Sequence, residues 1–435
     1  MRAALLLALL VAGVADARDR RCGKNRLNAR TGDCVGYAFF EAFPATGAGT
    51  FGACSTTAPT GARGEVLTFS RTGNATCSKQ GLATTGIANG DLVVLSGNQP
   101  RVEPDSQGVL GLRAESSRTN LTIRSQDLTD AYWQKGGNLA TPSVTTVSET
   151  APDGSVGVSK ISMTRPTTAD YQYVQDDHTL AADGTYTGSL YVKAAPGFGG
   201  KIISLQGYTG TLNVGAVDVT LSEATWTRAV TTPQAQTAGS SKRIVAVGLG
   251  TAGASIGDVE FFAWGGQAEA GSYATSYIPT TSAAVVRNAE TATFVLPALT
   301  VTAPWSVAAT TQLPSAVATN ARVGGAGGTT GLVTALFDAY ASGGVLQVFS
   351  SQVSPNNYST GLSVTASSTS RYATYHDGTL FNGCVNATCA AGVARAWSNL
   401  ANTTTLSIGQ YTGAGAIDGI QSRICFQPDS ATRCR

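Results

Sequence analysis

A run of acidic and aromatic residues near position 170 is the part of this sequence best suited to bind a ligand. Asp170, Asp176 and Asp177 stand there with Tyr171 and Tyr173. Sugar rings stack on aromatic faces, and ionised carboxylates accept hydrogen bonds from sugar hydroxyls, so this cluster predicts a glycan-binding site. Carboxylate oxygens also suit calcium, and a solvated loop has the same composition. These two alternatives stay open at this point.

The pair Tyr132 and Trp133 extends the candidate site. Tryptophans more often lie in cores than on binding surfaces, but this pair stands in a loop-like stretch beside Gly136 and Gly137. Among the aromatic residues weighed against a place in the core, these two are therefore the best candidates for exposure. The full set of candidate glycan-binding residues is Tyr132, Trp133, Asp170, Tyr171, Tyr173, Asp176 and Asp177.

No combination of residues predicts catalysis. The segment 253–257 has the G-x-S-x-G pattern of hydrolases, but that motif needs a strand-to-helix turn with an acid and a histidine downstream. Here the surrounding residues favour strands, and His376 is the only histidine that follows. Glycosidases use two carboxyl groups about 5–9.5 Å apart, and the 27 acidic residues offer no evident pair. We expect a protein that is not an enzyme; a polysaccharide-degrading enzyme is the less favoured alternative.

Composition and periodicity indicate an all-β chain. Only 13% of the residues are charged, and 51 are glycines, whereas exposed helix faces favour Glu, Lys and Gln. Short alternating stretches are separated by turn residues such as Asp377-Gly378. The stretch from Thr185 to Lys193 is typical of a strand that is buried on one face. The pattern predicts two tandem β-sandwich (jelly-roll) domains after a small Cys-rich N-terminal segment.

The N-terminus and the cysteines favour an oxidising compartment. Residues 1–17 resemble a signal peptide, with Arg2 before an apolar run and Ala15-Asp16-Ala17 at its end. The apolar run is too short for a stable membrane span, and a net charge of +2 argues against nucleic acid as a partner. Eight cysteines allow 105 connectivities. Nearest-neighbour pairing is the simplest hypothesis: Cys22 with Cys34, Cys54 with Cys77, Cys384 with Cys389, and Cys425 with Cys434.

Three stretches resemble a layout that recurs in phage and prophage tail fibre proteins. The first resembles "FTR-ST-AT … PRF", the second "GLLIEEARTNLLTYSEDFSNAAW" and the third "GAQLEAGSFATSYIPTTGSAVTR". They are Phe69–Thr76 with Gln99–Val102, Gly108–Leu121 with Ser125–Asp127 and Trp133, and Trp264–Thr281 with Val286-Arg287. The sequence departs from this family at Cys77, where the family tends to carry Tyr, and in its signal-like N-terminus. Glu115 and Glu269 lie inside these stretches, and we expect them to pair with Arg118 or Arg287.

The resemblance implies a carbohydrate-binding-module-like jelly roll followed by a concanavalin A-like (laminin G-like) sandwich. Together with the N-terminal pattern, this resemblance divides the chain into five expected segments. They are residues 1–17 as a signal peptide, 18–62 as a Cys/Gly-rich segment, 63–117 as a short-strand connecting region, 118–290 as the jelly roll and 291–435 as the second sandwich. The expected function is that of a secreted or cell-surface binding or structural protein for adhesion or fibre formation. Its expected partners are a surface polysaccharide or other glycan and further copies of itself, as in a trimer. The alternative is a structural protein of the phage virion; no cofactor is expected beyond a structural calcium ion.

Overall fold

Only strands, turns and irregular segments occur in the part of the chain that the computed structural model describes, which confirms the all-β prediction. That part comprises residues 37–38, 53–55, 67–208, 213–247, 254–301, 305–313, 321–328, 334–342, 345–349, 357–365, 368–396, 400–408 and 419–427. The expected signal peptide lies outside it. Within it, no helix has the length and apolar character to cross a membrane.

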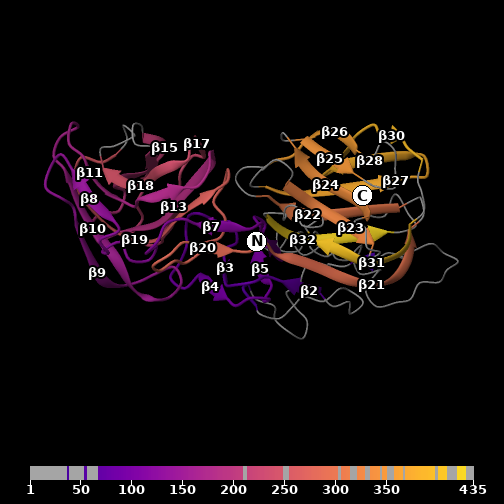
Figure 1. Ribbon diagram of the computed structural model, residues 1–435, viewed down its shortest axis with the longest axis horizontal. Coiled ribbons are helices and arrows are strands. Elements are labelled where there is room, and N and C mark those ends of the chain that lie inside the picture. The colour runs from indigo at the N-terminus through magenta and orange to yellow at the C-terminus, as the bar shows by residue number, and fades with distance from the viewer. Residues whose placement is uncertain are drawn as a thin grey trace, which may run out of the picture.

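The middle of the chain forms a sandwich of two antiparallel sheets, drawn on the left of Figure 1. The first sheet has the order β16-β13-β19-β10-β9, with β17 paired to β13. Its strands are β9 (Ser143–Thr150), β10 (Val156–Arg165), β13 (Gly184–Ala194), β16 (Thr227–Val230), β17 (Gln234–Gln236) and β19 (Gly257–Ala270). The second sheet has the order β15-β14-β18-β11-β8, with β12 paired to β18. Its strands are β8 (Gln134–Gly137), β11 (Gln172–Gln175), β12 (His178–Leu180), β14 (Ile202–Tyr208), β15 (Asn213–Thr220) and β18 (Gly239–Val247).

The C-terminal part contributes two further sheets, on the right of Figure 1. One has the order β29-β28-β27-β22-β32-β6-β5, with β1 paired to β32 and β30 to β28; the other has the order β2-β21-β31-β23-β24-β25-β26. The strands of the former are β1 (Tyr37–Ala38), β5 (Arg101–Pro104), β6 (Leu110–Ala114), β22 (Trp305–Gln312), β27 (Thr369–His376), β28 (Leu380–Val385), β29 (Thr388–Cys389), β30 (Val393–Ala394) and β32 (Gly419–Gln427). Those of the latter are β2 (Leu67–Ser70), β21 (Thr291–Val301), β23 (Ala321–Gly328), β24 (Thr334–Ser342), β25 (Val345–Phe349), β26 (Asn357–Ser363) and β31 (Leu400–Ile408).

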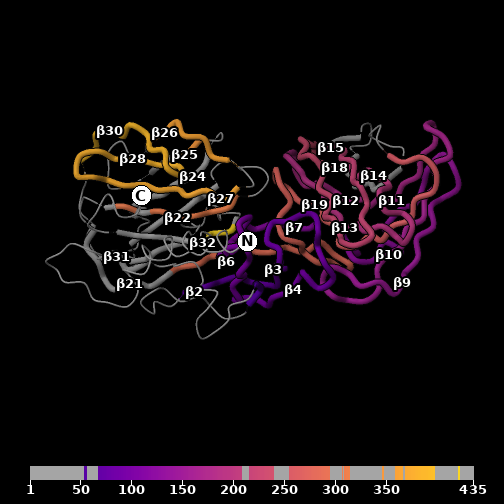
Figure 2. The backbone as a smooth tube through the Cα atoms, turned by 180° about the vertical axis from the view of Figure 1, so that it is seen from behind, coloured from indigo at the N-terminus to yellow at the C-terminus, as the bar shows by residue number. Residues whose placement is uncertain are grey.

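The connecting region supplies strands to both C-terminal sheets. Strand β2 pairs with β21, and β6 pairs with β32. Two small ladders, β3 (Ala75–Ser78) with β4 (Leu92–Leu95) and β7 (Arg118–Asn120) with β20 (Val285–Arg287), lie between the two halves in both views (Figures 1 and 2). The jelly-roll strands therefore occupy the interval between β7 and β20, and the chain enters and leaves them through one antiparallel pair.

Strand β13 is buried on both faces, so the prediction of a half-buried strand there is wrong. Leu190 and Val192 face the core between the two jelly-roll sheets. Tyr191 belongs to a second cluster, which Ile87 and Leu92 from the connecting region complete. Sequence alternation could not show this, because the opposite face carries polar residues such as Thr187 and Ser189 and is buried only where a distant segment of the chain covers it.

Two of the expected disulfides are present, Cys54–Cys77 and Cys384–Cys389. The latter joins facing residues of β28 and β29, next to the β27–β28 hairpin that Asp377-Gly378 predicts. In that turn the Asp377 carboxylate accepts hydrogen bonds from the backbone N–H groups of Thr379 and Leu380. The other two expected pairs each include cysteines outside the described residues.

Candidate functional site

The outward face of the second jelly-roll sheet is lined by hydrogen-bonding side chains. Leu205 points into the core, so its neighbours Ser204 and Gln206 must point outward. The register places Ser204 and Tyr173 opposite the same residue of β18, and it places Gln206 and Gln175 opposite the next outward position. Side chains in one cross-strand row share a face, so these four residues line the outward face together.

Two tyrosine rings on this face have nearly parallel planes. Tyr171 and Tyr173 are half-buried, with ring centroids 6.5 Å apart and planes only 8° from parallel. The Tyr173 ring crosses β8 at Gly136, where an added Cβ would come 2.6 Å from the tyrosine hydroxyl oxygen. Glycine at 136 is thus what lets the tyrosine lie flat over the neighbouring strand.

The amide side chains of this face form a second row. The Gln175 Nε2 atom donates to the Gln134 Oε1 atom at 2.8 Å. Further along the row, Gln206 is fully buried, and neither its amide nitrogen nor its amide oxygen has a hydrogen-bond partner. Most buried polar side-chain atoms in proteins do have a partner. The part of this face around Gln206 is therefore covered by other residues, and its exposed part lies at Gln134, Tyr171 and Tyr173.

The pair Tyr132 and Trp133 is not on this face, which corrects the expectation that Trp133 is exposed. Trp133 is 2% exposed and belongs to the jelly-roll core, against which Tyr132 also packs. The Trp133 indole N–H donates to the backbone carbonyl of Arg124 at 3.0 Å. Because this partner meets the one polar atom of the ring, the tryptophan fits the interior despite the nearby glycines.

The three aspartates of the candidate cluster do not converge. Asp170 is part of a turn, where its carboxylate accepts hydrogen bonds from the backbone N–H and the hydroxyl of Thr167. Asp176 is fully buried and accepts a hydrogen bond from the Thr122 hydroxyl at 2.6 Å. Asp177 is half-buried. Among the described residues no group of three or more His, Cys, Asp or Glu side chains is arranged to hold a metal ion.

Ser255, the serine of the G-x-S-x-G pattern, makes hydrogen bonds with backbone groups. The Ser255 hydroxyl accepts a hydrogen bond from the backbone N–H of Ile202 at 2.8 Å, and the Ser255 backbone N–H donates to the Ile202 carbonyl. His376 lies in β27, where its Nδ1 atom accepts a hydrogen bond from the Gly378 N–H. These contacts connect Ser255 to the first residue of β14 and His376 to the β27–β28 hairpin.

A buried network of charged side chains joins the connecting region to both ends of the jelly-roll segment. Arg101 contacts Glu115 and Glu290, and Arg113 contacts Glu103 and Glu115. The expected partners are confirmed, since Arg287 lies 2.7 Å from Glu115, and Arg118 lies 3.8 Å from Glu269. The sequence did not show the rest, because Arg101, Glu103, Arg113 and Glu115 alternate with apolar residues and so resemble a solvated strand face. The signal that could have found them is the complementary charge on two adjacent strands.

Burial and charge act in opposite directions on the carboxyl groups of this network. Burial raises the pKa of Glu103 above its ordinary value, and the nearby Arg113 only partly offsets this effect. Burial also acts to raise the pKa of Glu115, but Arg113, Arg287 and Arg101 together hold it well below 4.5. Glu115 is therefore the carboxylate whose ionised form the fold stabilises most clearly.

We predict that the stabilising effect of Glu115 is lost in acid. Its pKa is lower in the folded state than in the unfolded chain, so its contribution is present above pH 4.5 and falls as the pH drops toward the folded pKa. The difference in unfolding free energy between the wild type and Glu115→Gln should be largest at pH 7 and shrink below pH 4.5. Urea titrations across this range measure it. Glu103→Gln should show the opposite trend because its pKa is raised, and a constant Glu115→Gln difference would contradict the prediction.

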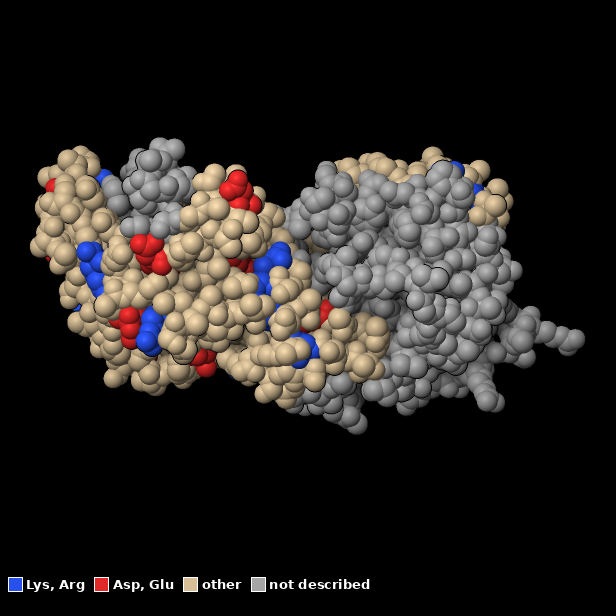
Figure 3. Space-filling model, in the orientation of Figure 1, with Lys and Arg blue, Asp and Glu red and all other residues tan. Residues whose placement is uncertain are grey.

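Charged groups are scattered over the described part of the jelly-roll surface. Figure 3 shows basic and acidic residues there in small separate groups, with no broad area of one sign on the face drawn. Recognition of a neutral, hydroxyl-rich ligand needs no such area, because hydrogen bonds and ring stacking supply the contacts.

Comparison with known proteins gives distant structural similarities, among them a phage protein and a bacterial one. No protein-family model matches the chain, and no curated protein matches it. The tail fibre protein gp63.1 of an E. coli phage is 10% identical with a TM-score of 0.24, over 72% of this chain and 41% of that one. The N-terminal CBM22-1-CBM22-2 tandem domain of Paenibacillus barcinonensis Xyn10C is 7% identical with a TM-score of 0.26, over 73% of this chain and 98% of that one. Both TM-scores are too low to carry an argument, so the function is inferred from the residues of this chain.

Proposed function

We propose that this protein is a non-enzymatic binding protein that recognises a glycan on the outward face of its second jelly-roll sheet. The observation that carries the proposal is the pair of parallel, half-exposed rings of Tyr171 and Tyr173 on that face. A sugar can stack its C–H groups against such rings while its hydroxyls reach the neighbouring polar side chains.

The other jelly-roll sheet is a weaker candidate because its outward face is occupied. Ile87 and Leu92 of the connecting region pack there against Tyr191, Trp226 and Trp264. The Trp226 indole N–H donates to the Asn89 side chain at 3.0 Å, which fixes this covering segment. Of the two outward faces, the one with the tyrosine pair therefore has partly exposed aromatic rings available for a ligand.

Hydrogen-bonding groups extend across the proposed binding face. Gln134 is exposed at one edge, on β8, and Asp218 is exposed at the other edge, on β15. Side chains that both donate and accept are suited to sugar hydroxyls, which do the same. We place the protein at a cell surface or on a virion, where glycans of this kind are met; the disulfides Cys54–Cys77 and Cys384–Cys389 support an oxidising environment.

An array of purified polysaccharides and oligosaccharides tests the proposal. We expect the full chain to bind a subset of these glycans, with the bound material recovered at its original length and with no new reducing ends. Binding without cleavage supports a binding protein. Release of reducing sugar would contradict the non-enzymatic assignment, and the absence of binding to every glycan class would contradict the proposed ligand.

A further inference from the structure

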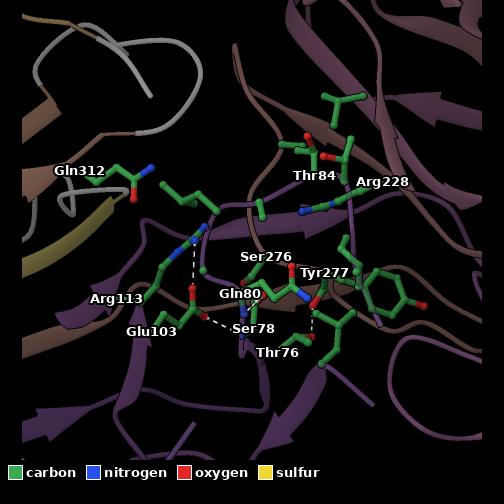
Figure 4. Close-up of a pocket in the computed structure, with 18 of the residues that line it drawn as sticks. Thr76, Ser78, Gln80, Thr84, Glu103, Arg113, Arg228, Ser276, Tyr277 and Gln312 are labelled. Atoms are coloured by element: carbon green, nitrogen blue, oxygen red, sulfur yellow. Dashed lines mark hydrogen bonds and ion pairs between the residues drawn. The ribbon is translucent and has the colours of Figure 1, made fainter. Parts of the chain in front are cut away.

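A cavity with both polar and apolar lining residues lies where the jelly roll meets the connecting region and β22. It has a volume of about 570 Å³, and its lining includes Ser78, Asp105, Arg113, Arg228 and Tyr277. Figure 4 shows Arg113 and Arg228 reaching in from different sides of the cavity. This size lies within the range of about 300–1,000 Å³ that is usual for small-molecule sites.

Two guanidinium groups at this cavity have an N–H group without an acceptor. Arg113 uses its terminal nitrogens for Glu103 and Glu115, and Arg228 donates to the Ser189 hydroxyl at 3.0 Å. The Nε atoms of both arginines are buried and have no hydrogen-bond partner. A buried donor that is left unpaired destabilises the fold, so a ligand that accepts from both nitrogens would gain two hydrogen bonds.

The cavity also presents one acceptor with a fixed position. The Asp105 Oδ1 atom accepts hydrogen bonds from the backbone N–H groups of Gln107 and Val109, each at 2.9 Å. Its Oδ2 atom is buried and has no partner. Because the turn holds the carboxylate in place, Oδ2 can accept a hydrogen bond from a ligand hydroxyl.

The charge balance around the cavity favours an anion. In the neighbouring network four guanidinium groups face three carboxylates, all of them buried; the members are Arg71, Arg101, Arg113, Arg287, Glu103, Glu115 and Glu290. At the cavity, Arg228 and Asp105 add one charge of each sign. One positive charge is left over, and a ligand carboxylate would neutralise it.

We propose that this junction cavity binds a sugar acid, with its carboxylate accepting from the Nε–H groups of Arg113 and Arg228 and a ring hydroxyl donating to Asp105. Charge-assisted hydrogen bonds to guanidinium are among the stronger polar contacts in proteins. The site is separate from the outward face that carries Tyr171 and Tyr173, which we call the tyrosine face, and it does not depend on the glycan proposed there.

Calorimetric titration of the full chain with glucuronate and with glucose tests the assignment. Glucose has a similar ring but no carboxylate, so the wild type should bind glucuronate at least tenfold more tightly. Arg228→Met should weaken glucuronate binding at least tenfold. Arg228→Lys keeps the charge but lacks the Nε–H group, and it should also bind more weakly than the wild type; it serves as the test should Arg228→Met fail to fold.

Two controls separate this site from its surroundings. Lys79→Met removes an exposed positive charge outside the cavity lining, and it should leave glucuronate binding unchanged. Tyr173→Ala should also leave it unchanged, so failure here and failure of the tyrosine face are distinguishable. Equal affinity for glucose and glucuronate, no binding of either, or wild-type glucuronate binding by the Arg228 variants would overturn the proposal.

Discussion

Replacing Glu290 with Gln is expected to lower the free energy of unfolding by about 3–5 kcal/mol, the range for removing one partner of a buried ion pair. Glu290 is fully buried, and its carboxylate accepts from Arg71 at 2.6 Å, from Arg101 through two nitrogens, and from the Glu115 backbone N–H at 2.9 Å. The amide of Gln has one acceptor oxygen and adds two N–H donors among these donors. Four arginines would then face two carboxylates.

The matched control for this variant is Glu260→Gln. Glu260 contacts Lys160 at 2.6 Å, but both side chains are about one-third exposed. Surface pairs contribute about 0–1 kcal/mol, so this variant should change stability little. Urea unfolding at pH 7, followed by circular dichroism, measures both. A loss below about 1 kcal/mol for Glu290→Gln would show that the network does not hold the junction together.

The second large effect is expected in binding rather than stability. Tyr173→Ala should weaken glycan binding at least tenfold, which corresponds to about 1.4 kcal/mol. The substitution removes one of the two parallel rings and uncovers the β8 backbone at Gly136. Because Tyr173 is half-buried on the outward face while Val174 fills the core, the fold should tolerate the change.

Tyr186→Ala is the control for Tyr173→Ala. Tyr186 is also half-buried, and its hydroxyl donates to the Ala182 carbonyl at 2.7 Å, but it belongs to β13 in the other sheet. Affinity for a glycan identified on the array should therefore stay at the wild-type value. Titration of Tyr173→Ala and Tyr186→Ala with this glycan measures the two affinities, and the unfolding midpoints show whether each variant is folded. Equal losses in the two variants would mean that the tyrosine face is not the binding site.

Local signals predicted the strands and turns better than they predicted the surfaces. The Asp377-Gly378 turn and the strand at 185–193 were foreseeable because turn chemistry and alternation act over a few residues. The pairing of β6 with β32 was not, since it joins residues about 300 positions apart and no local pattern encodes such a register. The same limit applies to Trp133, whose burial depends on both jelly-roll sheets closing around it.

The candidate site was only partly predictable for the same reason. Tyr173 lies in β11 and Tyr171 directly precedes that strand, and residues two apart in an extended segment share a face. Asp170 and Asp176 separate because one ends a turn and the other points inward. The place of Gln206 in the same row as Gln175 depends on β14 lying two strands away from β11, which only the sheet order reveals. Similarly, the local sequence of β5 and β6 predicts a solvated charged face, because it does not show that the jelly-roll segment covers that face.

Glycan binding on the outward face of the second jelly-roll sheet can be tested by nuclear magnetic resonance. The bound glycan is located with isotopically labelled protein and a glycan that the array identifies. If the glycan binds this face, the largest chemical-shift changes fall on β8 and β11, around Gln134, Gly136 and Tyr173. Shift changes confined to β13 and β19, or to the C-terminal sheets, would contradict it and would place recognition elsewhere on the molecule.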